Sequence, residues 1–248
     1  LTDKPFNRYY LHSVDGFVYM SEQVHSELRA YSDAPALFSP HPLFENFGER
    51  VERSEACVRL GLDPANRYVL FFGLIRDYKG LDLLLDAWAQ LRRAGRTEGR
   101  RLIVAGEFYT AREPYLNRIA DNGLQDEVLL HDRFIPDDDV KYYFSAADFV
   151  VQPYKTATQS GVTQIAYQFC VPMVVTKVGG LAEIVPDGRV GYVCEPTPEG
   201  VAGAIERMYE GDTLQRFREN CVEERRRFSW EEMCSRITEL YGLVASGK

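Results

Sequence analysis

The chain has few cysteines and histidines, and their spacing fits neither a metal site nor a disulfide framework. There are four histidines and five cysteines, an odd number, and no C-x-x-C pair occurs. The cysteines are scattered widely: Cys57, Cys170, Cys194, Cys221 and Cys234. This pattern argues against a zinc cluster and indicates small buried thiols in a reducing compartment.

Long apolar runs and excess positive charge are also absent from the sequence. No segment reaches the roughly 20 apolar residues of a membrane span, and the first residues do not resemble a signal peptide. The net charge is −8 and the pI about 5.2, so no overall positive field attracts nucleic acid. We therefore expect a cytoplasmic protein that does not bind nucleic acid, in which local cations hold any anionic ligand.

The sequence does contain a regular alternation of apolar runs and segments of helical period, beginning near residue 67. With 45% hydrophobic residues among 248, the chain can bury a sizeable core. The predicted strands are 68–72, 101–105, 128–131, 149–152, 173–176 and 191–194. The predicted helices are 80–95, 112–122, 137–147, 161–169 and 198–210, followed by 212–227 and 230–245, which we do not expect to return to the sheet.

This alternation predicts an α/β fold with a doubly wound, Rossmann-like parallel sheet. The strands are apolar throughout rather than alternating, which is typical of a parallel sheet covered on both faces. In the helix at 80–95, Leu81, Leu84, Leu85, Trp88 and Leu91 form a stripe that faces the core. Ligands of such folds bind at the carboxyl ends of the strands.

The segment FFGLIRDYKG, from Phe71 to Gly80, is the first candidate binding site. An apolar strand ends at Gly73, and Arg76 and Lys79 then precede a helix. The amide groups of a helix N-terminus favour anions, and two nearby cations can bind two phosphate oxygens. We expect a diphosphate ligand, although two solvated loop residues would give the same pattern.

The segment from Val151 to Val175 contains a second candidate site. A strand ends near Pro153, and hydroxyl and amide side chains then crowd the start of the next helix. The residues concerned are Thr158, Gln159, Ser160, Gly161, Val162, Thr163 and Gln164. They can bind an anion or sugar hydroxyls, or Ser160 or Thr158 can simply cap the helix, and the two roles are compatible.

The first 46 residues do not form a domain of their own. They contain one expected strand within 15–21, one helix ending near Tyr31, and an extended connector over 36–42. One strand and one helix cannot bury a core. Because the chain also starts without a methionine, we expect residues 1–46 to be the remnant of a preceding domain and residues 47–248 to form a complete one with C-terminal helices.

Several motifs in order make the chain resemble the C-terminal half of a GT-B glycosyltransferase of family 4, the glycosyl transferases group 1. They are FFGLIRDYKG (71–80), LIVAGEF (102–108), FIP (134–136), SAADFVVQPY (145–154), PMVVTKVGGLAEIV (172–185), GYVCEP (191–196) and FSW (228–230). They span about residues 67–232 and are specific for the family but not for the sugar. The first 46 residues resemble the end of the N-terminal half.

The resemblance implies a retaining transfer from a UDP- or GDP-linked sugar to a saccharide or lipid-linked acceptor, without a metal or other cofactor. The donor would lie in this half and the acceptor mostly in the missing N-terminal domain of the same protein. Arg76 and Lys79 would be catalytic, stabilising the departing diphosphate, and one of its oxygens would take the acceptor proton. Phe134, Ile135 and Pro136 resemble the edge that binds the nucleobase. Peripheral membrane association of the full-length protein is compatible with this family.

Two departures from the family pattern concern the ribose and the phosphates. Family members commonly carry two glutamates at the positions of Ala157 and Ile165 here, and the second holds the ribose. Gln164 is one candidate to replace it. The basic residue that often follows the glycine is Leu74 here, and we expect Arg76 to take its place, with Lys155 as a third cation or a solvated loop residue.

The missing glutamates keep an alternative open, in which the chain is a non-catalytic module that binds a nucleotide sugar. A dinucleotide-dependent oxidoreductase on a similar sheet is disfavoured, because no G-x-G-x-x-G follows any predicted strand.

Overall fold

The computed structural model describes residues 9–246, which divide into two compact units. One unit comprises residues 44–225 and contains both candidate segments. The other combines the chain up to Leu43 with the chain from Arg226 onward. The two units are described separately below.

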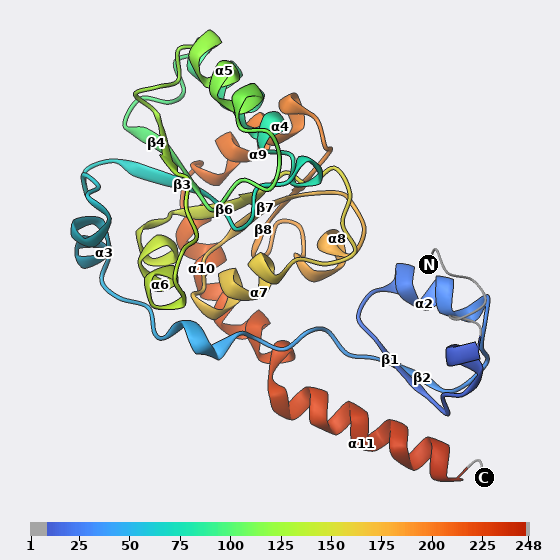
Figure 1. The fold of residues 1–248 in the computed structure, drawn as a ribbon. Coiled ribbons are helices and arrows are strands. Elements are labelled where there is room, and N and C mark those ends of the chain that lie inside the picture. The colour runs from blue at the N-terminus through green and yellow to red at the C-terminus, as the bar shows by residue number, and fades with distance from the viewer. Residues whose placement is uncertain (1–8, 247–248) are drawn as a thin grey trace. The chain divides into compact units, whose positions relative to one another are not determined.

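A six-stranded parallel sheet forms the centre of the unit at 44–225 (Figure 1). Its strands are β3 (Arg67–Phe72), β4 (Arg100–Ala105), β5 (Val128–His131), β6 (Phe149–Gln152), β7 (Met173–Thr176) and β8 (Gly191–Cys194). The spatial order is β5-β4-β3-β6-β7-β8, and every neighbouring pair is parallel. The order reverses between β3 and β6, so the predicted doubly wound Rossmann-like sheet is confirmed.

Helices cover both faces of this sheet. They are α3 (Arg53–Leu60), α4 (Leu81–Arg93), α5 (Glu113–Asp121), α6 (Asp137–Ala146), α7 (Gly161–Gln168), α8 (Leu181–Ile184), α9 (Pro198–Met208) and α10 (Thr213–Glu224). Figure 1 shows α4 and α9 on one face and α6 and α7 on the other. Helix α3 was not predicted, because it buries only Ala56 and Cys57 and so has little apolar periodicity.

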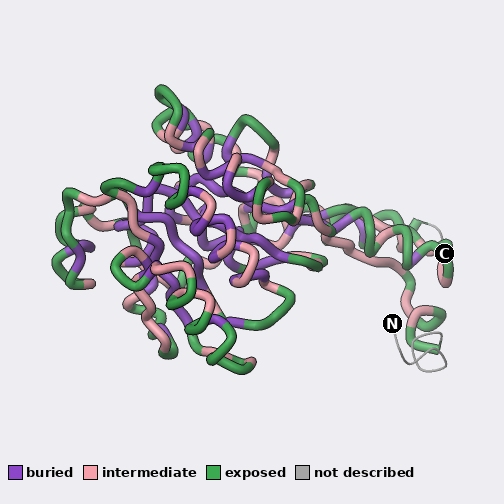
Figure 2. Tube along the Cα trace, turned by 90° about the horizontal axis from the view of Figure 1, so that it is seen from above, coloured by how far each residue is buried: buried purple, intermediate pink, exposed green. Residues whose placement is uncertain are grey.

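One part of the core lies between the sheet and α4 and α9, and another lies on the opposite face, where Phe144 of α6 packs on Phe72 of β3. Figure 2 shows the buried residues gathered in the interior of this unit. Leu84, Leu85 and Trp88 are fully buried there, as the apolar stripe predicted, and the Trp88 indole donates to Glu127 at 2.9 Å. Helix α10 also reaches the core, since Phe217 packs edge to face on Tyr192 of β8 with 5.1 Å between ring centroids. The expectation that the segment at 212–227 stays away from the sheet is therefore wrong.

The other unit contains a small parallel pair of strands, with helices before, between and after them. Strands β1 (Phe17–Tyr19) and β2 (Ala36–Phe38) pair with each other, α2 (Glu22–Arg29) connects them, and α11 (Trp230–Ser246) packs on both. The segment at 36–42, expected to be an extended connector, thus begins with a paired strand.

Helix α11 groups with β1 and β2 rather than with the six-stranded sheet. Its buried Leu240 lies so close to Gly16 that a Cβ on that glycine would be 3.0 Å from the leucine side chain. This differs from the predicted division at residue 46, which placed the last helix with the sheet domain. The interpretation of residues 1–46 as a remnant stays a prediction.

Candidate functional site

The two candidate segments lie side by side at the carboxyl ends of β3 and β6. These strands are neighbours at the point where the strand order reverses. Loops that leave adjacent parallel strands in opposite directions create a crevice there, which is where doubly wound sheets bind ligands. The sheet topology therefore brings together residues that are about 80 positions apart in the sequence.

The loop after β3 makes a sharp turn that requires glycine. Gly73 has a φ of 96°, and its amide donates to the Ala105 carbonyl at 2.9 Å. A Cβ on Gly73 would lie 3.2 Å from the Lys79 ammonium nitrogen. The absence of a side chain at Gly73 thus leaves space for that ammonium group beside the backbone.

A short 3-10 turn, Asp77–Lys79, precedes α4. Arg76 lies immediately before this turn, and Lys79 is its last residue. The Lys79 amide donates to the Arg76 carbonyl at 2.9 Å, and Gly80 then takes a left-handed conformation before α4 begins at Leu81. The sequence placed both cations before the helix; the turn separates Arg76 from α4, whereas only Gly80 separates Lys79 from it. The Lys79 ammonium group lies beside Tyr154 on the loop after β6.

The loops after β3 and β6 are held together by backbone contacts. A Cβ on Gly80 would collide with the Pro153 carbonyl oxygen, and the Lys155 amide donates to the Tyr78 carbonyl at 2.7 Å. The Lys155 ammonium group bonds the Asp82 carboxylate at 2.7 Å. Lys155 is thus occupied by an ion pair and does not line the cavity described below, which leaves the idea of a third cation unsupported.

Ser160 caps helix α7. Its hydroxyl accepts a hydrogen bond from the Val162 amide at 3.2 Å and lies 3.1 Å from the Tyr154 hydroxyl. The capping interpretation is therefore confirmed for Ser160. Thr158 does not cap the helix; its carbonyl accepts from the Gly180 amide at 3.2 Å.

A cavity of about 310 Å³ lies between these loops. Its polar side combines Gly73 and Lys79 with Gln159, Ser160 and Gly161 at the start of α7. The remaining wall is mostly apolar and aromatic, formed by Phe44, Phe47, Phe72, Tyr78, Tyr154, Val162 and Ile165. The cavity lining contains no aspartate, glutamate or histidine.

The Lys79 ammonium group is the only cation on this lining and forms no ion pair within residues 9–246. Burial lowers the pKa of Lys79 to about 8, and repulsion from Arg76 adds to the effect. Its nitrogen lies 5.7 Å from the centroid of the Tyr154 ring. A half-buried ammonium without a carboxylate partner costs free energy, which an anionic ligand would offset.

Arg76 lies outside the cavity lining. Its side chain is exposed, and the guanidinium carbon is 5.2 Å from the centroid of the Tyr109 ring on the loop after β4. Neighbouring contacts hold this loop: Asp77 accepts from the Thr110 hydroxyl at 2.7 Å and from the Tyr115 hydroxyl at 3.1 Å. The structure thus separates the two predicted catalytic cations into one inside the cavity and one at the surface.

Several other predicted binding residues are also outside the lining. Thr163 is fully buried and its hydroxyl donates to the Gln152 side chain at 3.0 Å, while Gln164 is buried. Phe134 and Pro136 are exposed and Ile135 is buried between β5 and α6, away from the lining. Ile165, at the position of the absent family glutamate, does line the cavity.

Sequence reasoning missed the aromatic part of the site, namely Phe44, Phe47, Phe72, Tyr78 and Tyr154. Phe72 and Tyr154 stand at or just beyond the carboxyl ends of predicted strands, which was an available signal. Phe44 and Phe47 precede the sheet by about 20 residues and join the cavity only through the fold: a Cβ on Gly161 would be 3.4 Å from the Phe44 ring.

No group of three or more metal-ligating side chains occurs among residues 9–246. The described residues also contain no helix that is both long and apolar enough to cross a membrane.

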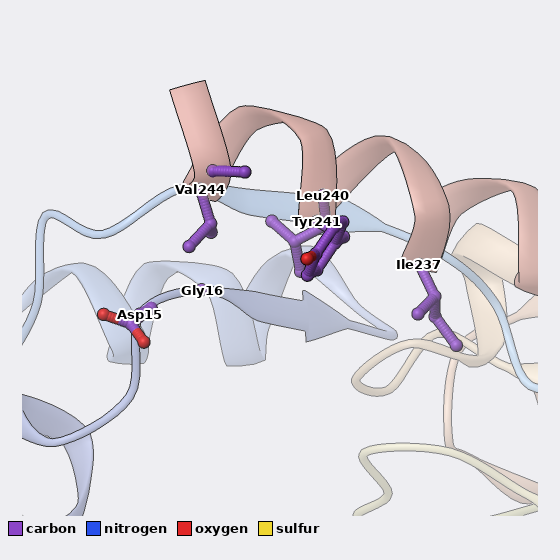
Figure 3. A pocket seen from close by; sticks show the side chains of 7 residues that line it. Asp15, Gly16, Ile237, Leu240, Tyr241 and Val244 are labelled. Atoms are coloured by element: carbon purple, nitrogen blue, oxygen red, sulfur yellow. The ribbon is translucent and has the colours of Figure 1, made fainter. Parts of the chain in front are cut away.

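The unit that contains α11 has a separate apolar cavity of about 470 Å³ (Figure 3). Asp15 and Gly16 line one side of it, and Ile237, Tyr241 and Val244 project from α11 on the other. It contains none of the predicted site residues and, apart from Asp15, no charged group.

Residues 66–211 match the model of the family described as Glycosyl transferases group 1. This match covers more than half of the chain. The chain belongs to this family. It is also 31% identical over 245 residues to D-inositol 3-phosphate glycosyltransferase 2 of Catenulispora acidiphila, covering 92% of the chain and 56% of that protein. The chain thus spans about half the length of the curated relatives it matches.

Solved glycosyltransferase structures share the fold. Sucrose-phosphate synthase from Thermosynechococcus elongatus superposes with a TM-score of 0.79 at 22% identity, covering 98% of this chain and 61% of that one. Anabaena HepE in complex with UDP and glucose superposes with a TM-score of 0.72 at 18% identity, covering 97% of this chain and 68% of that one. The GT-B fold class inferred from the motifs is therefore confirmed.

Proposed function

We propose that this chain is the donor-binding half of a retaining glycosyltransferase, which transfers a sugar from a UDP- or GDP-linked donor to a saccharide or lipid-linked acceptor. One observation carries the proposal: the unpaired Lys79 ammonium and the N-terminus of α7 converge on one cavity at the switch point of the sheet. Membership of a glycosyltransferase family and the UDP and glucose bound to HepE support it.

The polar side of the cavity fits the diphosphate of such a donor. Lys79 supplies a positive charge, and the Gly161 amide, at the first position of α7, has no acceptor within its own helix. Charge on the leaving diphosphate grows as the bond to the sugar breaks. A preorganised ammonium group and helix N-terminus stabilise that charge more in the transition state than in the bound donor, which lowers the barrier.

The proton of the acceptor hydroxyl needs a destination, and no carboxylate or imidazole lines the cavity. We assign this role to an oxygen of the leaving diphosphate, which becomes more basic as the sugar departs. Bond breaking and bond formation then take place on the same face of the sugar, which retains the configuration at its anomeric carbon. The acceptor itself would be positioned by the rest of the full-length protein.

We also propose that donor binding and sugar transfer do not require a metal ion. Lys79 lies in the cavity and Arg76 is a charged neighbour outside its lining, and we assign to them the neutralisation of the phosphates for which other enzymes use Mg²⁺. Donor binding and transfer should therefore persist in excess EDTA. Activity that is lost in EDTA and restored by Mg²⁺ would contradict this part of the proposal.

The proposed function is tested first by binding and then by turnover. In a thermal-shift panel of nucleotides, UDP or GDP and the corresponding nucleotide sugars should raise the melting temperature of this chain, whereas NAD should not. Turnover with the stabilising donor is then compared between this chain and a version extended to the full length of its relatives. Transfer by the extended protein alone is the expected result, because acceptor positioning contributes up to about 7–11 kcal/mol of barrier lowering.

A non-catalytic nucleotide-sugar-binding module is the second candidate. It is favoured by Ile165, which puts an apolar side chain on the cavity where family members commonly carry a glutamate. Donor binding without transfer by the extended protein would select this alternative. Absence of any nucleotide binding would reject both.

A further inference from the structure

Tyr154 joins the two elements that form the polar side of the cavity. It follows Pro153 just beyond the carboxyl end of β6, and it is only 2% exposed. It is the last residue of the SAADFVVQPY motif, which by itself does not distinguish it from an ordinary core tyrosine. Its ring and its hydroxyl, however, contact different parts of the site.

The Tyr154 ring lies next to the Lys79 ammonium group. The nitrogen is 5.7 Å from the ring centroid, within the range at which an aromatic face attracts a cation. Tyr78 packs against the same ring nearly at right angles, with 6.0 Å between centroids. The lysine therefore has an aromatic neighbour where a structural lysine would have a carboxylate.

The Tyr154 hydroxyl contacts the start of α7. It is 3.1 Å from the Ser160 hydroxyl oxygen, and that oxygen in turn accepts from the Val162 amide at 3.2 Å. Tyr154 is thus one hydrogen bond away from the first turn of the helix. A shift of Tyr154 would be transmitted both to the cap and to the lysine.

The main chain of Tyr154 is fixed from the sheet. Its carbonyl accepts a hydrogen bond of 2.6 Å from the Thr176 hydroxyl at the end of β7, and the neighbouring Pro153 carbonyl touches Gly80. Thr176 is the last residue of β7, and Gly80 immediately precedes α4. The tyrosine is therefore held in one place, as preorganisation of a charged site requires.

We propose that Tyr154 is a positioning residue, which holds the Lys79 ammonium and the N-terminus of α7 in a fixed relation so that one diphosphate contacts both. This inference rests on the proposed function, because it names a determinant of that same site. In this role Tyr154 acts through Lys79 and the start of α7 rather than directly on the transferred sugar.

Two substitutions distinguish the contact of the Tyr154 hydroxyl with Ser160 from the contact of the Tyr154 ring with Lys79. Tyr154→Phe keeps the ring and removes the hydroxyl, so we expect UDP or GDP, whichever binds, to lose about threefold to tenfold in affinity. Tyr154→Leu removes both contacts and should lose about tenfold or more. Binding of the corresponding free nucleoside should change by less than about twofold in both variants, because only the phosphates lie at the polar side.

Tyr68→Phe is the matched control. Tyr68 is equally buried, and its hydroxyl donates to the Asp63 carbonyl at 2.8 Å near the opposite end of β3. Tyr68→Phe removes a buried hydroxyl group at a position that does not line the cavity. The diphosphate affinity of this variant should therefore equal that of the unchanged protein. A general loss of packing would affect both tyrosines, whereas a positioning role affects only Tyr154.

A spectroscopic readout makes the test independent of ligand binding. The Tyr154 ring current should displace the NMR signals of the Lys79 ε-methylene group, and Tyr154→Leu should abolish that displacement while Tyr154→Phe keeps it. Equal diphosphate affinity in the unchanged protein and Tyr154→Phe, or an unchanged Lys79 signal in Tyr154→Leu, would overturn the inference alone. If the unchanged protein binds no nucleoside diphosphate, the proposed function fails.

Discussion

Arginine side chains surround a buried carboxylate at the amino ends of β3 and β6, whereas the lysine at the carboxyl ends of the same strands has no carboxylate partner among residues 9–246. Asp148 accepts from the Tyr68 amide at 2.8 Å and forms ion pairs with Arg67 at 3.2 Å and with Arg218 at 4.0 Å. At the other end Lys79 faces an aromatic ring and has Arg76 as its charged neighbour.

The cations at the two ends of these strands have different roles. Arg67 and Arg218 stabilise the fold by pairing with Asp148, whereas the proposed partner of Lys79 is an anionic ligand. A buried charge is compatible with stability when it is paired and hydrogen-bonded, as Asp148 is. Lys79 satisfies neither condition, so the folded chain bears a cost that an anion in the cavity would relieve. Each of the following changes tests one side of this contrast.

Asp148→Asn should have the largest effect, and the effect should be on stability. The substitution removes a carboxylate that is only 2% exposed and leaves the part-buried Arg218 and the more exposed Arg67 without it; breaking the buried side of this cluster costs about 3 kcal/mol in the free energy of unfolding. Urea denaturation measures the loss. Asp82→Asn is the matched control, since the Asp82 carboxylate is 26% exposed rather than buried, and its pair with Lys155 should contribute less than about 1 kcal/mol.

Diphosphate affinity should be unchanged in the folded fraction of Asp148→Asn. A large loss of affinity there would mean that the two ends of the strands are not independent.

Lys79→Met should lower diphosphate affinity by about 1.5–3 kcal/mol, because a charge-assisted hydrogen bond to phosphate is lost. Calorimetric titration with UDP or GDP measures this, and the free nucleoside is the control ligand. Equal losses for nucleotide and nucleoside would show that Lys79 does not contact the phosphates.

The same substitution should raise the stability of the free chain by about 2 kcal/mol at pH 7. Burial lowers the pKa of Lys79 to about 8 from its ordinary 10.5, so the unfolded chain binds the proton more tightly than the folded one. The destabilisation of the folded chain by the Lys79 ammonium group is fully present below pH 8 and disappears as the pH rises to 10.5. The advantage of Lys79→Met in urea denaturation should therefore shrink across that interval, and a constant advantage would argue against a desolvated ammonium.

Arg76→Ala should have the smallest effect, a loss of about 0.5–1 kcal/mol in diphosphate affinity. Its side chain is exposed and screened by solvent, outside the cavity lining. Removing it also relieves the repulsion that lowers the pKa of Lys79, which partly compensates. A loss as large as that of Lys79→Met would show that the guanidinium swings into the cavity when the ligand binds.

The six strands of the sheet were predicted within a residue of their observed bounds. Their apolar runs are buried on both faces, so hydrophobicity alone marks them. Strand β2 was missed as a strand because it has three residues, none of them fully buried. The grouping of α11 with β1 and β2 depends on contacts between segments about 200 residues apart, which local sequence patterns do not contain.

Sequence analysis located the site residues correctly where a glycine, a lysine or a group of polar residues comes after a predicted strand. Gly73, Lys79 and the residues Gln159 to Val162 lie between the end of a strand and the first turn of the next helix, and the cavity includes them all. Thr163 and Gln164 were misjudged because the sequence does not show which way each turn of α7 faces: both are buried beneath the helix, while Ile165 lines the cavity. Tyr154 was overlooked because an aromatic residue after a buried strand is usually only core.

The most direct test of the account is the melting temperature of Lys79→Met with and without the nucleoside diphosphate that binds the unchanged chain. The account predicts a crossed result at pH 7: the variant melts at a higher temperature than the unchanged chain without ligand, and the ligand stabilises the unchanged chain but has little effect on the variant. A variant that melts lower without ligand and is stabilised as much as the unchanged chain would contradict the claim that Lys79 is an unpaired cation awaiting a diphosphate.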